Sequence, residues 1–199
     1  YYNTPGWFIN NQDYYDRYDR AKPKVYLGEY AAHLPGRPNN IETALAEALY
    51  LTSVERNGDI VSMTSYAPLL AKEGHTQWNP DLIYFNNREV KPTVGYYTQL
   101  LYGQNSGDSY LPADRKIDNP RQEVQKRIGT SVVRDSKTGD WIVKLVNLLP
   151  VPVKANVEGL APVENGKAVL QVLSGKPTDK NARPVSYTHL RAHETDSYL

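Results

Sequence analysis

The feature that most restricts the fold is a pair of short apolar runs separated by a helical pattern. Lys24–Leu27 (KVYL) is a β-prone run that ends at Gly28, and Ile60–Tyr66 (IVSMTSY) is a second run that begins about 36 residues after the first. The segment between them carries apolar residues at helical spacing. The order strand, helix, strand predicts two parallel strands joined by a right-handed crossover.

The ends of the intervening helix can be predicted from its flanking residues. Asn39 is the expected N-cap, with Glu42 three residues later, and Asn57 with Gly58 is the expected end. One face of the helix is expected to be buried, formed by Ile41, Ala44, Leu45, Ala48, Leu49 and Thr52.

A second helix is predicted from about Pro92, a residue type favoured in the first turn of helices, to Gly103. The cluster Arg17–Arg20 is interpreted as the charged start of another helix, before the first strand. Residues 1–105 are therefore expected to hold two β/α units.

The pattern changes after Ser106, where a turn-rich linker leads into short β-prone runs. The loop 135–139 ends in Gly, which suits a hairpin turn that needs a positive φ. Short strands at this spacing, broken by Pro and Gly, predict part of a β-sandwich over residues 106–184. The strand candidates are residues 127–134, 140–149, 151–157 and 167–173.

The last fifteen residues differ in kind from the rest of the chain. Val185–Thr195 resembles the in-frame translation of a transposase sequencing adapter, so residues 185–199 are interpreted as a non-native tail. His189 and His193 have a spacing of four that could suggest a metal site, and they are set aside with the tail. Because the chain begins at Tyr1 without a Met, we expect it to be a piece of a longer protein.

Composition excludes several classes of function. The chain has no Cys, which excludes a disulfide framework and thiolate metal sites, and it leaves the cellular compartment open. A formal net charge of +1 gives no electrostatic footprint for nucleic acid. No apolar run approaches the roughly 18 residues that would span a bilayer. We therefore expect no nucleic-acid partner and no membrane partner.

Glu29 stands where chemistry is expected in a parallel sheet. It directly follows KVYLG, and in parallel barrels the residues at the carboxyl ends of strands carry the reaction. Tyr66 occupies the equivalent place after the second strand, where its phenol could donate a hydrogen bond to Glu29 and keep it ionised. The alternative interpretation is structural: a Glu that caps or pairs at a strand end, with Tyr66 as packing.

The loop from His75 to Phe85 mixes amides and an aromatic ring, with Gln77, Trp78 and Asn79 in succession. Sugar hydroxyls bind amide groups, while the C–H face of a sugar packs on an aromatic ring. The chain also has 16 Tyr against 2 Phe, a balance that favours surfaces that both stack and hydrogen-bond. This loop is therefore a candidate sugar subsite, although most of the Tyr residues suit ordinary half-buried packing.

Five motifs together resemble one enzyme family. They are YY-x-x-P-x-WF, YDxYDR-x-x-PKVYLGEYA, ALAEALYLTSVERNGDIVSMTSYAPLLA, QWNPDLIYFNN and YYTQLLYGQNSGD. They closely resemble the C-terminal half of α-L-arabinofuranosidases of glycoside hydrolase family 51, in the same order from Tyr1 to about Leu111. The resemblance implies the C-terminal part of a (β/α)8 barrel followed by part of a β-sandwich, an α/β plus all-β chain.

The resemblance also implies an activity and roles for individual residues. The activity is release of terminal α-L-arabinofuranosyl groups from arabinan or arabinoxylan with retention of configuration, without a metal or other cofactor. Glu29, in GEYA after the seventh barrel strand, is the implied nucleophile. Tyr2 is implied to border the sugar subsite from the end of strand six, and Gln77 or Trp78 from the loop after strand eight. Relatives often form oligomers, so a homo-oligomer is a possible assembly.

One departure from the family pattern bears on activity. The family's acid/base Glu lies in an Asn-Glu motif after strand four, and the motif has no counterpart here, so the chain as written is expected to be inactive.

Two alternatives to this function stay open. The chain could belong to a noncatalytic carbohydrate-binding module, although its β region offers only Tyr110 and Trp141 as aromatics before the tail, or to a relative acting on β-glucans or xylans.

Overall fold

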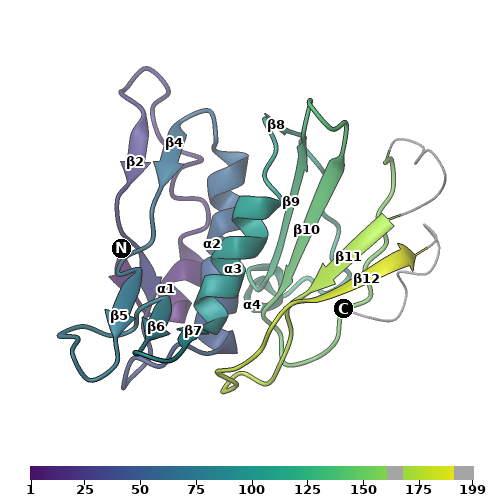
Figure 1. Ribbon diagram of the computed structural model, residues 1–199. Helices are drawn as coiled ribbons and strands as arrows, with labels where there is room; N and C mark the ends of the chain where they lie inside the picture. The colour runs from purple at the N-terminus through teal and green to yellow at the C-terminus, as the bar shows by residue number, and fades with distance from the viewer. Residues whose placement is uncertain (161–167, 191–199) are drawn as a thin grey trace.

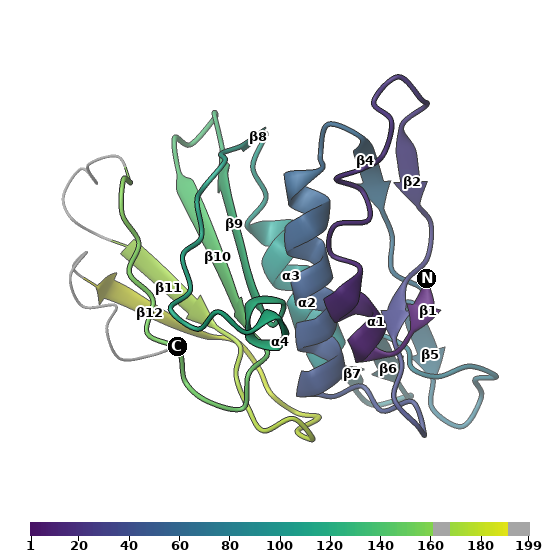
Figure 2. The same cartoon turned by 180° about the vertical axis from the view of Figure 1, so that it is seen from behind.

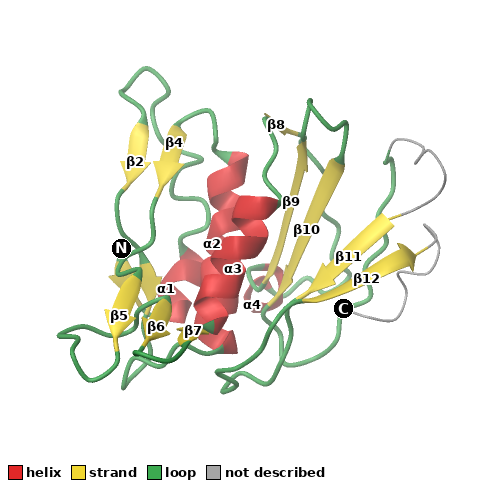
Figure 3. Cartoon of the chain, in the orientation of Figure 1, coloured by secondary structure: helices red, strands yellow, loops and turns green. Residues whose placement is uncertain are grey.

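The computed structural model describes residues 1–160 and 168–190. Helices α2 and α3 lie in the middle of the molecule, with β1–β7 on one side and β8–β12 on the other (Figures 1 and 2). Figure 3 shows short strands on the side of β1–β7 and longer strands, β9 and β10, on the other side. The elements are β1 (Tyr2–Asn3), α1 (Pro5–Asn10), β2 (Val25–Leu27), β3 (Ala31–Ala32), α2 (Ile41–Arg56), β4 (Val61–Thr64), β5 (Leu70–Lys72), β6 (Ile83–Phe85), β7 (Val90–Pro92), α3 (Val94–Gln104), β8 (Ser109–Tyr110), α4 (Gln122–Gln125), β9 (Ile128–Arg134), β10 (Trp141–Asn147), β11 (Ala168–Val172) and β12 (Val185–Leu190).

The predicted strand–helix–strand unit is confirmed. Strand β2 pairs in parallel with β4, and α2 connects them. Strand β1 pairs in parallel with β3, which lies only a few residues beyond β2 on the same segment of chain. The segment 25–32 therefore pairs with β4 near its start and with β1 near its end. A separate sheet has the order β5-β6-β7, with β5 and β6 parallel.

Helix α2 begins one residue later than the sequence predicts. Its N-cap is Asn40, whose side chain accepts the backbone N–H of Thr43, while the Thr43 hydroxyl accepts the N–H of Asn40. The prediction of Asn39 and Glu42 for these roles was wrong. The Asn39 side chain instead accepts the backbone N–H of Gly95 and so joins the start of α2 to α3.

Helix α2 is buried on more than the single face that its periodicity suggested. Tyr50 packs toward β2, β3 and β4 in the first part of the chain (residues 1–105), and its neighbour Leu49 packs toward the other side with Val146 of β10. Full burial of a side chain such as Leu49 stabilises the fold by about 1.5–3 kcal/mol. The buried residues of α2 are Ile41, Thr43, Ala44, Ala46, Glu47, Ala48, Leu49, Tyr50, Leu51, Thr52, Ser53 and Val54.

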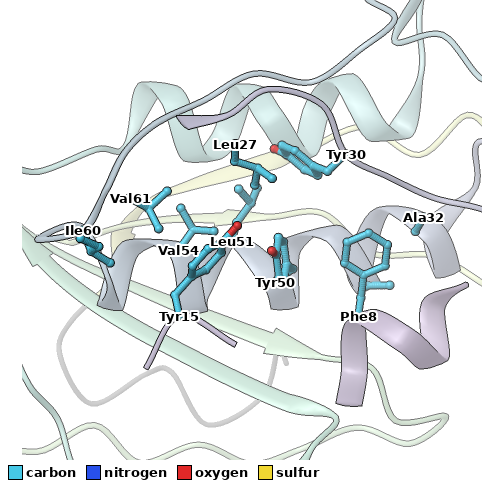
Figure 4. Close-up of a cluster of buried hydrophobic side chains, with 11 residues drawn as sticks. Phe8, Tyr15, Leu27, Tyr30, Ala32, Tyr50, Leu51, Val54, Ile60 and Val61 are labelled. Atoms are coloured by element: carbon cyan, nitrogen blue, oxygen red, sulfur yellow. The ribbon is translucent and has the colours of Figure 1, made fainter. Parts of the chain in front are cut away.

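The main core lies between α2, α1 and the first strands (Figure 4). Aromatic rings fill much of it: Phe8 meets Tyr50 edge to face at 5.2 Å, an arrangement favoured by the ring quadrupoles. The buried members are Phe8, Tyr15, Leu27, Tyr30, Ala32, Ala46, Tyr50, Leu51, Val54, Ile60 and Val61. Several of the many Tyr residues are therefore core residues, in line with the alternative that most of them serve ordinary packing.

Two further expectations about the first part were wrong, and one short helix was missed. The second long helix begins at Val94 with Thr93 as its N-cap, because Pro92 is paired with Ile83 at the end of β7. The short helix α1 was not predicted from the sequence. The segment 17–20 forms turns rather than the start of a helix, and Arg20 there binds backbone carbonyls and the Asp59 carboxylate.

The second part is a three-stranded antiparallel sheet, β8-β9-β10, and a two-stranded sheet, β11-β12. The hairpin between β9 and β10 is confirmed, with Gly139 at φ +82°. The predicted strand at 151–157 was wrong: that stretch has no regular structure, and Pro150 and Pro152 carry no N–H for a sheet ladder. The linker after Ser106 contributes β8, which was not expected.

Strand β9 packs closely on α2 and holds the two parts together. A Cβ atom on Gly129 would lie 2.6 Å from Cδ1 of Leu49, so glycine allows the sheet to approach the helix. Glu55 of α2 forms an ion pair of 2.5 Å with Lys144 of β10 and accepts the hydroxyl of Ser131 of β9. The second part therefore packs against the side of α2 that faces away from β2 and β4.

Part of the predicted non-native tail falls within the described residues. Residues 185–190 form β12, which runs antiparallel to β11, and residues 191–199, including His193, lie outside the described part. Within the described ranges, no helix is long and apolar enough to cross a membrane.

Candidate active site

Glu29 lies two residues after the end of β2, at the carboxyl end of the parallel pair β2-β4, and its side chain is exposed. The Tyr2 hydroxyl donates a hydrogen bond to Oε2 of Glu29. Burial and the neighbouring Glu29 raise the pKa of the Tyr2 hydroxyl to about 12, so Tyr2 keeps its proton throughout the neutral range. The structure thus brings together two of the site residues predicted from the sequence, one from each of two neighbouring strands.

The end of β4 is joined to the end of β2 by Ser65, which the sequence analysis did not single out. Its backbone N–H donates to the carbonyl of Leu27 at 3.0 Å, and its hydroxyl donates to the carbonyl of Gly28 at 2.9 Å. The hydroxyl of Tyr26 also lies 2.6 Å from Oγ of Ser65. These bonds fix the backbone immediately before Glu29.

Tyr66 does not make the expected hydrogen bond with Glu29. Its hydroxyl instead lies 3.5 Å from Oε1 of Glu47, a buried carboxyl group of α2. The ring is half-buried and packs edge to face against Tyr30 at 5.5 Å, which turns the phenol toward the helix. The donor to Glu29 is therefore Tyr2, and the prediction of Tyr66 for this role was wrong.

Three rings from three different segments form a group that reaches Glu29 through Tyr2. Tyr2 stacks on His33 with 5.4 Å between ring centroids and 15° between planes, and Trp78 lies 5.7 Å from Tyr2. Trp78 is 37% exposed, so part of its surface is accessible to a ligand. The guanidinium carbon of Arg37 stands 4.5 Å from the centroid of Trp78, within cation–π range.

His33 is a site residue that the sequence analysis missed, although it lies only four positions after Glu29. Its backbone N–H donates to the carbonyl of Asn3, in register with the β1-β3 pairing. Burial, and then the nearby Arg37, lower the pKa of His33, so the imidazole is neutral at pH 7. Its buried Nε2 atom has no hydrogen-bond partner within the described residues.

Gln77 precedes Trp78 in the loop after β5, and its side chain is exposed. The loop is partly ordered by its own contacts: the Thr76 hydroxyl donates to the carbonyl of Trp78 at 2.9 Å. The structure therefore places Tyr2, Glu29 and Trp78 in one contact network, with Gln77 adjacent to it along the chain and Tyr66 turned inward behind it.

Among the described residues, neither a metal-binding cluster nor a second carboxyl group bonded to Glu29 is found at the site. Among them, no group of three or more His, Asp or Glu side chains is arranged to hold a metal ion. Within the same part of the chain, no hydrogen bond joins Glu29 to another carboxyl group. The site has one exposed carboxylate, one phenol that donates to it and a partly exposed aromatic surface.

Comparison with known proteins shows the family to which the chain belongs. The sequence profile of the family described as the α-L-arabinofuranosidase C-terminal domain matches residues 13–196. The chain belongs to this family. The resemblance seen in the sequence motifs is therefore confirmed, and the sheet-rich chain fits the C-terminal domain of these enzymes.

Related proteins of the α-L-arabinofuranosidase family match a little over half of the chain. An extracellular exo-α-L-arabinofuranosidase of Streptomyces chartreusis is 49% identical over 113 residues, covering 57% of the chain and 13% of the relative. A probable α-L-arabinofuranosidase A of Aspergillus terreus is 39% identical over 110 residues, covering 54% and 17%. α-L-Arabinofuranosidase 1 of Arabidopsis thaliana is 37% identical over 105 residues, covering 51% and 15%. The matches span less than a fifth of the length of these relatives.

Solved structures of arabinofuranosidases have the same fold over nearly the whole chain. The arabinose-bound MgGH51 α-L-arabinofuranosidase has a TM-score of 0.80 and 29% identity, and the match covers 94% of this chain and 32% of that one. The GH51 arabinofuranosidase of Xanthomonas axonopodis pv. citri has a TM-score of 0.66 at 19% identity, covering 96% and 48%. At that lower identity the likeness shows the fold alone.

Proposed function

We propose that the chain is the C-terminal part of a retaining α-L-arabinofuranosidase and that Glu29 is its nucleophile. The observation that carries the proposal is the placement of the Glu29 carboxylate at the carboxyl end of the β2-β4 pair, with the Tyr2 hydroxyl on Oε2. Carboxylates at this end of parallel strands serve catalysis in barrel enzymes. The longer protein that contains this chain is called the complete enzyme below.

On this proposal the first part of the chain is the end of a (β/α)8 barrel, and residues 106–184 are part of a β-sandwich. The parallel pairing supports it, because β1, the segment 25–32 and β4 follow one another as neighbours, as consecutive barrel strands do. A complete barrel of this type has about 250 residues. The preceding strands then belong to the complete enzyme.

The reaction needs two carboxyl groups about 5 to 5.5 Å apart. Glu29 attacks the anomeric carbon of the arabinofuranosyl group and forms a glycosyl ester, while the second carboxyl group protonates the leaving oxygen as the C–O bond breaks. The second group then removes a proton from water, which displaces Glu29 and releases arabinose with retained configuration. On this proposal the second group comes from the preceding part of the complete enzyme, so the chain by itself is inactive.

The neighbouring residues bind and orient the sugar. Tyr2 donates to one oxygen of Glu29 and leaves Oε1 free of that bond for attack. Trp78 offers its exposed face to the C–H surface of the pentose, and Gln77 supplies an amide for a hydroxyl group. Tyr66 closes the inner side of the subsite with its half-buried ring. No metal or organic cofactor takes part, because the two carboxyl groups suffice.

The rival proposal, a noncatalytic carbohydrate-binding module, has less support. In the described part of the sheet β8-β9-β10, Trp141 is 40% exposed and Tyr110 is half-buried, which is a small aromatic surface for a polysaccharide. Tyr2, His33 and Trp78 form a larger group, and its member Tyr2 is hydrogen-bonded to Glu29.

The assay compares the 199-residue chain, the complete enzyme and its Glu29→Gln variant on p-nitrophenyl α-L-arabinofuranoside. We expect the complete enzyme to release p-nitrophenol and the other two proteins to show no turnover above background. Parallel assays on arabinan, xylan and β-glucan decide the polymer. Full activity of the Glu29→Gln enzyme would contradict the assignment of the nucleophile, and turnover by the chain alone would contradict its dependence on the preceding part.

A further inference from the structure

Glu47 is a buried carboxyl group that the proposed mechanism does not use. It lies in the middle of α2, where its neighbours in sequence are Ala46 and Ala48, and it is 2% exposed. Acidic residues are almost never fully buried without a partner. The side chain therefore has a specific role in the fold or in the site.

The contacts of Glu47 lead to the segment that carries Glu29. Its Oε1 atom accepts the backbone N–H of Ala32 at 2.9 Å, and the Tyr66 hydroxyl lies 3.5 Å from the same oxygen. Ala32 is three residues after Glu29, and Tyr66 is two residues after the end of β4. One oxygen of α2 thus contacts both of the strand ends that border the site.

The geometry of the strand explains why Ala32 needs this acceptor. The N–H groups of Ala31 and His33 donate to the carbonyls of Tyr1, just before β1, and of Asn3 in β1. The N–H of Ala32, between them, points to the opposite edge, because successive N–H groups of a strand alternate in direction. Strand β4 flanks β2 and has ended at Thr64, and Glu47 supplies the acceptor that a continued strand would supply.

We propose that Glu47 is a positioning residue that holds the Glu29–Ala32 segment in place through the N–H of Ala32. The bond to α2 on one edge and the two bonds to β1 on the other fix this segment from both sides. The carboxylate of Glu29 is held by that backbone on one side and by the Tyr2 hydroxyl on the other. The inference rests on the proposed function, since it concerns the placement of the nucleophile.

The protonation state of Glu47 determines which substitution imitates it. Burial raises the pKa of Glu47 to about 8, against the opposing effect of the Ala32 N–H and the Tyr66 hydroxyl. The titratable groups that face it are Tyr30 and Tyr66, whose own pKa values are raised above the ordinary value mainly by burial. The carboxyl group is therefore mostly neutral at pH 7, and a Gln side chain presents the same accepting oxygen.

The test uses three substitutions of Glu47 in the complete enzyme, compared at pH 7. Glu47→Gln keeps the acceptor, Glu47→Asp withdraws it by one methylene group, and Glu47→Met removes it at similar volume. Glu55→Met is the matched control, because Glu55 lies two turns further along α2 and contacts β9 and β10 instead of the site. The readouts are kcat and KM on p-nitrophenyl α-L-arabinofuranoside and hydrogen exchange of the peptide that carries the Ala32 amide.

A shift of about 1 Å in a reacting group can cost about 100-fold in rate. We expect kcat to fall by about 10- to 100-fold in Glu47→Met and by less in Glu47→Asp, with KM changed by less than about 3-fold. Glu47→Gln should stay within about 3-fold of the wild type, and the Ala32 amide should exchange faster in the Met and Asp enzymes alone. The control should lose thermal stability while it keeps its kcat.

Two results would overturn the inference. One is a Glu47→Met enzyme with the kcat of the control and a protected Ala32 amide. The other is a Glu47→Gln enzyme that loses as much kcat as Glu47→Met, since a lost charge and not a lost acceptor would then be responsible. If Glu47→Met does not fold, Glu47→Asp and Glu47→Gln decide by the same criteria. Failure of the wild-type enzyme to cleave the arabinoside would refute the proposed function, whereas Ala32 exchange would still report on the contact with Glu47.

Discussion

The Tyr2 hydroxyl donates its hydrogen bond to Oε2 of Glu29 across two neighbouring strands of the first part of the chain. Tyr2 belongs to β1, and Glu29 follows β2, so the bond depends on the parallel packing of these segments. Because the raised pKa of Tyr2 keeps the phenol protonated, the donor is present at every pH at which the enzyme is expected to work.

Removal of this donor should slow the reaction. Hydrogen bonds to charged groups contribute about 1.5–3 kcal/mol, so Tyr2→Phe in the complete enzyme should lower kcat/KM by about 10- to 100-fold. Tyr97→Phe, a change of the same kind on α3, is the control and should leave kcat/KM unchanged. Steady-state kinetics on the arabinoside measure both. Equal activity of the two variants would show that Glu29 does not need the Tyr2 hydroxyl.

Loss of the Trp78 ring should weaken binding of the sugar. We expect Trp78→Ala to raise KM by about 10-fold, which corresponds to about 1.4 kcal/mol of lost stacking. Trp141→Ala is the matched control, because Trp141 is 40% exposed against 37% for Trp78 and lies in the second part of the chain. A larger effect on sugar binding from Trp141 than from Trp78 would favour the carbohydrate-binding module instead.

The ion pair between Glu55 and Lys144 should contribute to stability. The two side chains are 17% and 10% exposed, and breaking such a pair leaves a poorly solvated charge. We expect Lys144→Met to destabilise the protein by about 2 kcal/mol and the double variant with Glu55→Met to recover at least half of that loss. Urea unfolding of the four proteins completes the cycle. Strict additivity of the two single changes would mean that the pair does not couple α2 to β10.

Glu47 should make stability depend on pH. The folded-state pKa of about 8 lies above the ordinary value of 4.5, so the folded protein binds more protons than the unfolded chain between these values. The contribution of Glu47 to stability is therefore fully present below about pH 4.5 and is lost as pH rises through about 8. Urea unfolding from pH 5 to 8.5 should show this loss in the wild type and a smaller loss in Glu47→Gln. If stability depended on pH in the same way in both proteins, a group other than Glu47 would be responsible for the pH dependence.

Local patterns in the sequence predict much of the fold. The run KVYL, its spacing to Ile60 and the Gly139 that ends a loop between two β-prone runs are local features of the sequence. The parallel β2-β4 pair and the β9-β10 hairpin follow from them. The choice between Asn39 and Asn40 as N-cap does not follow from local patterns. Asn39 accepts the N–H of Gly95, which belongs to a helix far away in the sequence.

The site could be predicted less completely, for a related reason. Glu29 was predicted from its position after the KVYL run and from the family motifs, and Tyr2 from the motifs alone. The direction of Tyr66 depends on Glu47, an acid placed among the apolar residues of α2. The position of Glu47 among apolar residues can be seen in the sequence, but an analysis of helical periodicity alone does not use it. His33 joins the site only because the β1-β3 pairing brings its ring over Tyr2.

The central claim is that Glu29 forms a covalent bond to the sugar. The most direct measurement incubates the complete enzyme with a 2-fluoro-arabinofuranosyl substrate that slows release of the intermediate, then locates the added mass by peptide mass spectrometry. The account predicts one fluorinated pentosyl group on the peptide that contains Glu29, and none in the Glu29→Gln enzyme. A labelled carboxyl group at another position, or turnover of the substrate without any label, would contradict it.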